Sequence, residues 1–145
     1  MTDLTDGASA AIETVMLIDD DTFFHAACER LMRRTGLVNN LIKFAMAEEA
    51  LAFLERPDRP VIDVLFLDIN MPRMNGFEFL EEALARFGKD FCRMIIVMLT
   101  SSVNPQDIER AKAFCAIDEF ANKPLVQAQI EAIAAQLKAA GRPVV

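Results

Sequence analysis

The sequence alternates short apolar runs with longer segments in which apolar residues recur at helical spacing. Five runs are typical of strands, at residues 15–18, 41–45, 61–67, 94–99 and 116–121. Five segments of helical period cover residues 24–32, 48–54, 77–87, 105–115 and 126–137. Strict alternation of strand and helix predicts right-handed crossovers and a parallel sheet, and unbroken apolar strands indicate that helices cover both faces. We therefore expect an α/β fold, a doubly wound five-stranded parallel sheet with five helices.

The chain length allows one compact domain. It has 145 residues, and the segment 1–13 is small, polar and acidic without a usable period. We expect a flexible N-terminal tail over residues 1–13, a domain over residues 14–140, and a short C-terminal tail over residues 141–145 with no output domain.

The charge balance limits the partners that the protein can have. Fifteen Lys and Arg oppose 22 Asp and Glu, so the net charge is −7, and such a surface repels nucleic-acid phosphate and anionic lipid. No apolar run approaches the ~18 residues that cross a bilayer, and the start of the chain lacks a basic segment. We expect a soluble cytoplasmic protein that binds neither nucleic acid nor membrane.

The cysteines and the single histidine argue against a zinc site or a disulfide framework. Cys28, Cys92 and Cys115 are odd in number and widely spaced, and His25 has no other histidine to act with. We expect reduced thiols in the core and a surface histidine without a role.

Polar residues of complementary chemistry follow four of the predicted strands. These are Asp19, Asp20 and Asp21; Asp68 and Asn70; Thr100, Ser101 and Ser102; and Lys123 with Pro124. In doubly wound sheets the ligand lies at the carboxyl ends of the strands, so these side chains should share one edge. Asp21 is the exception, because its place before a helix is typical of an N-cap.

The residues at this edge favour phosphoryl transfer. Clustered carboxylates repel one another unless a cation neutralises them, and an all-oxygen cluster suits Mg²⁺. With a metal and Lys123 to neutralise phosphoryl oxygens and Thr100 to donate a hydrogen bond, Asp68 could act as the nucleophile that forms an acyl phosphate.

These residues resemble the receiver domains of two-component response regulators over residues 14–137. The segment 15–21, with its acidic pair, is similar to the first strand of that family, and residues 65–76 (LFLDINMPRMNG) resemble its phosphorylation loop. The resemblance implies the flavodoxin-like strand order 2-1-3-4-5.

The resemblance also implies a role for each residue at the edge. Asp68 would accept the phosphoryl group from a histidine kinase or a histidine phosphotransfer protein. The ligands of Mg²⁺ would be Asp20, Asp68 and the backbone carbonyl of Asn70, with Asp19 acting through water. Thr100 and Lys123 would contact the phosphoryl group, Phe120 would move inward with Thr100, and the Lys123–Pro124 bond would be cis. Many members have Tyr where this chain has Phe120, so no contact can depend on a tyrosine hydroxyl here.

We therefore expect a stand-alone response regulator that signals through an unidentified protein effector or by forming a homodimer, and that catalyses only its own phosphorylation and dephosphorylation. A relay intermediate or phosphate sink is an alternative. A haloacid-dehalogenase-like phosphatase is less favoured, because Asn70 stands where that superfamily has a second Asp. A docking module that works without phosphate is the remaining alternative.

Overall fold

The computed structural model describes residues 2–4, 10–101, 104–114 and 116–139. Its strands are β1 (Thr2–Asp3), β2 (Ile12–Ile18), β3 (Val38–Phe44), β4 (Val64–Asp68), β5 (Ile95–Thr100) and β6 (Glu119–Asn122). Its helices are α1 (Thr22–Thr35), α2 (Ala47–Leu54), α3 (Gly76–Phe87), α4 (Pro105–Lys112) and α5 (Gln127–Ala139), with a 3₁₀ helix η1 (Gly88–Arg93).

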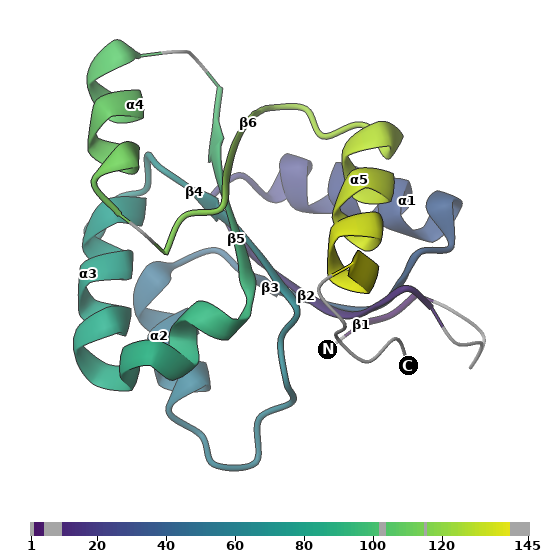
Figure 1. Cartoon of the computed structure of the whole chain (residues 1–145), viewed down its shortest axis with the longest axis horizontal. Helices are drawn as coiled ribbons and strands as arrows, with labels where there is room; N and C mark the ends of the chain where they lie inside the picture. Colours follow the sequence, from purple (N-terminus) through teal and green to yellow (C-terminus); the bar gives the residue numbers. More distant parts are fainter. Residues whose placement is uncertain (1, 5–9, 102–103, 115, 140–145) are drawn as a thin grey trace.

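The sheet has the order β1-β3-β2-β4-β5-β6, and every pair except β1 with β3 is parallel. The five parallel strands confirm the predicted α/β fold. Without β1, these strands are numbered 1 to 5 along the chain, and the order β3-β2-β4-β5-β6 becomes the predicted order 2-1-3-4-5. The five helices lie on both faces, with α1 and α5 on one side and α2, α3 and α4 on the other (Figure 1).

The strand β1 differs from the flexible tail expected over residues 1–13. Thr2 and Asp3 pair antiparallel with Leu41 and Asn40 of β3. The backbone N–H of Leu4 donates to the Asn39 carbonyl at 2.8 Å, and the Leu4 side chain is buried. A two-residue strand carries no readable period, so its partner on β3 determines its conformation.

Side chains alternate along each strand, so one sheet supports two separate cores. Val15 and Leu17 of β2 pack in the cluster beneath α1 and α5, whereas Met16 and Ile18 pack beneath α2 and α3. Because helices cover both faces of the sheet, the strands are apolar along their whole length. The packing on both faces also fixes the register of each strand, and therefore the position of its last residue.

Side-chain caps begin three of the helices. Asp21 accepts from the backbone N–H groups of Phe23 and Phe24 and caps α1, as predicted. Asn75 and Glu78 form a capping box at the start of α3, and Asn104 caps α4 ahead of Pro105.

The prediction of a buried thiol is correct for Cys28 and wrong for Cys92, which is exposed. Cys92 lies in the 3₁₀ helix that follows α3, where only Phe91 turns inward. Cys115 lies outside the described residues. Within the described ranges, no helix combines the length and the apolar character that a bilayer crossing requires.

Gly76 brings the start of α3 against the end of β4. A Cβ atom on this residue would lie 2.5 Å from the Asp68 backbone oxygen and 3.0 Å from Cε of Met98. The backbone N–H of Gly76 also donates to the Ile69 carbonyl at 2.9 Å. The first helical residue of α3 therefore sets the position of the backbone at Asp68.

We expect Gly76→Ala to lower the free energy of unfolding by ~1–3 kcal/mol, because the added methyl group overpacks a backbone contact. Chemical denaturation of the variant and the wild type measures this difference. The double variant Gly76→Ala with Met98→Leu serves as the control. It should stay destabilised, since the carbonyl and not the flexible thioether is the obstacle, and recovery of stability would contradict this explanation.

Candidate functional site

The candidate site lies at the carboxyl ends of the parallel strands. Asp19 and Asp20 follow β2, Asp68 and Thr100 end β4 and β5, and Lys123 follows β6. One carboxylate oxygen from each of Asp19, Asp20 and Asp68 lies within 4.8 Å of the other two. Asp20 is exposed, while Asp19 and Asp68 are buried. The fold thus gathers these three carboxylates at one edge.

Lys123 joins the two buried carboxylates. Its Nζ lies 2.5 Å from Oδ2 of Asp19 and 3.5 Å from Oδ1 of Asp68. The ammonium also lies over the ring of Phe24, 4.7 Å from its centroid, where the face of the π-system attracts a cation. The Lys123–Pro124 bond is cis, as predicted.

Asp19 is completely buried and has a partner on each oxygen. Its Oδ1 accepts from the backbone N–H of Asp21 at 2.8 Å, while Oδ2 faces Lys123. This arrangement shapes the turn from β2 into α1 and leaves Asp20 on the surface side of the cluster.

The site raises the pKa of Asp68 to about 6. Burial is the largest cause, and the charge of Asp19 adds to it, whereas Lys123 and the backbone N–H of Asn70 favour the carboxylate and limit the rise. Burial lowers the pKa of Lys123, but the hydrogen bond to Asp19 and the charge of Asp68 outweigh it and raise that pKa overall. The Lys123 ammonium therefore lies beside two buried carboxyl groups, and the Asp20 carboxyl belongs to the same cluster.

The chemistry of these donors fits a hard cation. All three side chains are carboxylates, and two of them are buried with a single ammonium between them. The cluster could therefore hold a metal ion whose preferred ligands are oxygens.

The other expected residues of the site have definite positions. Thr100 is fully buried, and its backbone oxygen accepts from the Lys123 N–H at 2.8 Å. Asn70 is exposed, next to the cluster. Ser101 is exposed, and Ser102 lies outside the described residues.

Phe120 is half-buried in β6. Its side chain contacts the core beneath α2, α3 and α4, and it lines a cavity of about 220 Å³ between α4 and β6.

The prediction that His25 lies at the surface is wrong. Its side chain is buried in α1, and Nε2 lies 2.5 Å from the backbone oxygen of Asp19. This contact links α1 to the residue that precedes Asp20. The partner is a backbone carbonyl, which no side-chain motif reveals, and the proximity of His25 to the acidic pair is the one signal the sequence offers.

A family model for the response regulator receiver domain matches residues 15–135. This chain belongs to the response regulator receiver domain family. A two-component response regulator from Cytophaga hutchinsonii has the same fold, with a TM-score of 0.79 and 24% identity over 88% of this chain and 98% of that one. A response regulator receiver protein from Dyadobacter fermentans has a TM-score of 0.74 and 28% identity, over 90% of this chain and 99% of that one.

Longer proteins contain a similar segment. The hybrid signal transduction histidine kinase C of Dictyostelium discoideum is 30% identical over 124 residues, which are 82% of this chain and 10% of that protein. Hybrid kinase L of the same organism is 29% identical over 128 residues, which are 86% of this chain and 7% of that protein. This receiver domain therefore spans a tenth or less of the length of both relatives.

The raised pKa of Asp68 predicts a pH dependence of folding without added metal. The pKa is about 6 in the folded protein against an ordinary value of 3.8. As the pH falls from 7, the folded state binds a proton on Asp68 before the unfolded chain does. This group therefore adds stability as the pH falls through 6, and the gain is complete near pH 4.

In a buffer with chelator, Asp68→Asn should be more stable than the wild type by ~2 kcal/mol at pH 7 and by much less at pH 4. Denaturation curves at both pH values measure the difference. Asp90→Asn, a change at an exposed carboxylate of η1, should leave the pH dependence as in the wild type. If Asp68→Asn raised the free energy of unfolding equally at both pH values, the explanation would be wrong, because the gain is expected only where the buried Asp68 carboxyl group is ionised.

Proposed function

We propose that this receiver domain accepts a phosphoryl group on Asp68 from a phosphohistidine and transmits the change to a protein partner. The observation that carries the proposal is the geometry of Asp68, which lies at the end of β4 beside Lys123 and within 4.8 Å of two further carboxylates. Membership of the receiver family supports the same assignment.

The reaction requires the carboxylate form of Asp68. A carboxylate oxygen attacks phosphorus, the new P–O bond forms, and the P–N bond to the donor imidazole breaks with its electron pair remaining on nitrogen. A pKa of about 6 leaves most of the Asp68 population ionised at neutral pH. Asp19, which is fully buried and paired with Lys123, helps to hold the ammonium near Asp68.

We assign Mg²⁺ to the acidic cluster, with Asp20, Asp68 and the backbone carbonyl of Asn70 as ligands and Asp19 acting through water. When bound, the metal neutralises oxygens of the transferring phosphoryl group. Lys123 supplies a second positive charge, and its 3.5 Å contact with Asp68 places that charge beside the carboxylate that receives the phosphoryl group.

We also propose that Thr100 and Phe120 communicate the modified state. Phosphorylation adds negative charge and three acceptor oxygens, which favour an inward position of the Thr100 hydroxyl. Thr100 ends β5 and Phe120 lies in the neighbouring strand β6, where its ring lines the cavity beside α4. The phosphoryl group would shift an existing balance between two arrangements of this face.

A role as a relay intermediate or phosphate sink is the second candidate. The similarity to segments of two proteins named hybrid histidine kinases favours it. Rapid return of the phosphoryl group to a histidine phosphotransfer protein would support the relay, whereas a stable phosphorylated form with a new protein partner would support a regulator that acts on an effector.

The test of the phosphoacceptor is an intact-mass measurement after incubation with acetyl phosphate or phosphoramidate and Mg²⁺. The wild type should gain ~80 Da, the mass of one phosphoryl group on an acyl phosphate, and Asp68→Asn should gain none. The chain has no Trp or Tyr, so mass is a more direct readout than fluorescence.

Asp21→Asn is the matched control for this experiment. It removes an exposed carboxylate next to the cluster while keeping a residue that caps α1 well. This variant should gain the same mass as the wild type. A phosphoryl adduct on the Asp68→Asn variant would show that another residue accepts the phosphoryl group.

A further inference from the structure

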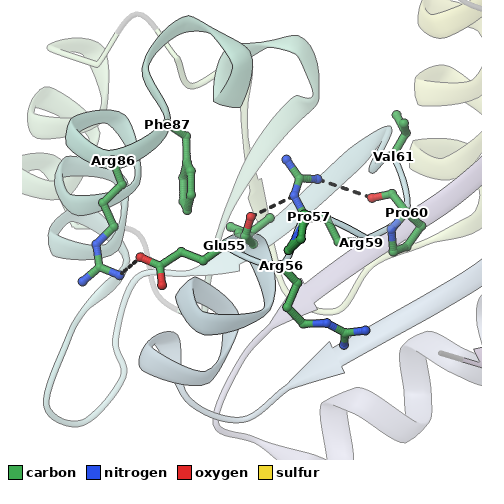
Figure 2. Close-up of a pocket in the computed structure, with 9 residues that line it drawn as sticks. Glu55, Arg56, Pro57, Arg59, Pro60, Val61, Arg86 and Phe87 are labelled. Carbon is green, nitrogen blue, oxygen red and sulfur yellow. Dashed lines mark hydrogen bonds and ion pairs between the residues drawn. The ribbon is translucent and has the colours of Figure 1, made fainter.

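A hollow of about 560 Å³ is lined by residues from the ends of α2 and α3 and the loop before β4 (Figure 2). Because this loop leads into the start of β4, the hollow lies at the end of the sheet opposite the acidic cluster. We call it the arginine groove, and its main lining residues are Arg56, Pro57, Arg59, Val61, Arg86 and Phe87. These residues take no part in the chemistry proposed for Asp68.

The arginine groove gathers three guanidinium groups on a protein whose net charge is negative. Its lining includes three arginines and one carboxylate, Glu55, whereas the whole chain has a net charge of −7. Arg59 is held in place by its donations from Nε to the Leu54 carbonyl at 3.0 Å and from Nη1 to the Pro60 carbonyl at 3.3 Å. Within the described ranges, Arg59 has no carboxylate partner.

The other two arginines pair with carboxylates. Arg56 contacts Asp58 at 3.1 Å, with both side chains more than half exposed. Arg86 contacts two carboxylates, Glu55 and Glu82, each at 2.7 Å. Exposed ion pairs of this kind contribute little stability. The Arg56 guanidinium can therefore turn toward an incoming carboxylate at small cost.

The rim of the groove is apolar. Val61 is 79% exposed, and Pro57 and the half-buried ring of Phe87 lie in the same hollow. A ligand that matches both features has an apolar side chain flanked by carboxylates.

This protein displays such a segment at the opposite end of its strands. Phe23, in the first turn of α1, is 87% exposed, the highest exposure among the large hydrophobic residues that the structure describes as exposed. Asp20 and Asp21 precede it in the chain and are also exposed. The Phe23 backbone N–H donates to Oδ1 of Asp21 at 3.0 Å, which fixes the start of this turn.

We propose that the arginine groove of one copy receives the Phe23 turn of a second copy. The phenyl ring would contact Val61 and Phe87, and the carboxylates of Asp20 and Asp21 would face Arg56 and Arg59. The two surfaces lie at opposite ends of the strands, so the contact joins different faces of the two copies and can repeat from copy to copy.

The test is sedimentation velocity of the whole chain from about 10 μM to about 1 mM, the range of weak association. The weight-average mass of the wild type should rise with concentration past that of a dimer. Phe23→Ser and Val61→Asp should each lower the association constant at least about tenfold, because each removes the centre of one of the two surfaces. Both residues are largely exposed, so neither change threatens folding.

A mixture of the two variants makes the test specific for a contact between unlike faces. The Phe23→Ser chain keeps its groove and the Val61→Asp chain keeps its Phe23 turn, so the mixture should form a 1:1 dimer and stop there. Val126→Ser, which changes another exposed apolar residue outside both surfaces, should associate like the wild type.

Three outcomes would overturn the proposal. They are a monomeric wild type at every concentration, association that neither Phe23→Ser nor Val61→Asp weakens, and a mixture of the two variants that stays monomeric while the wild type associates. Because no phosphodonor or metal is added, these outcomes are separate from failure of phosphorylation at Asp68.

Discussion

The contact of Lys123 with two buried carboxylates is the interaction on which the rest of the site depends. Asp19 and Asp68 both lie out of solvent, and one ammonium lies between them at 2.5 and 3.5 Å. Removing the ammonium would leave two buried carboxylates next to each other without a compensating charge. This requirement ties together the ends of β2 and β4 and the turn after β6, which are far apart in the sequence.

The two-sided burial of the sheet makes that contact reproducible. Met16 and Leu17 pack on opposite cores, so a shift of β2 by one residue would exchange their faces and move Asp19 away from Asp68. Gly76 adds a third restraint, since α3 approaches the Asp68 carbonyl so closely that a Cβ atom at this position would lie 2.5 Å from the oxygen. Packing on both sides of the sheet thus holds a site that is electrostatically unfavourable on its own.

The sequence predicts the parallel strands, the five helices and the residues at the strand ends, because these follow from periodicity and from the rule that parallel strands end at one edge. The carboxylate cluster and the Asp21 cap agree with what the residues predict, and the cis bond before Pro124 agrees with what the family resemblance implies. The burial of His25 could not be predicted in this way, because its partner is a backbone oxygen. The exposure of Cys92 depends on a 3₁₀ turn that has no periodic pattern, and β1 is too short to have one.

The short strand β1 also limits how the sheet can grow. An uncovered edge strand offers a row of backbone donors and acceptors to any extended chain nearby. Thr2 and Asp3 occupy the middle of the β3 edge, and the edge strand on the other side, β6, is four residues long. Neither side therefore offers a long, uninterrupted edge, and the fold has little room for pairing between the sheets of different molecules.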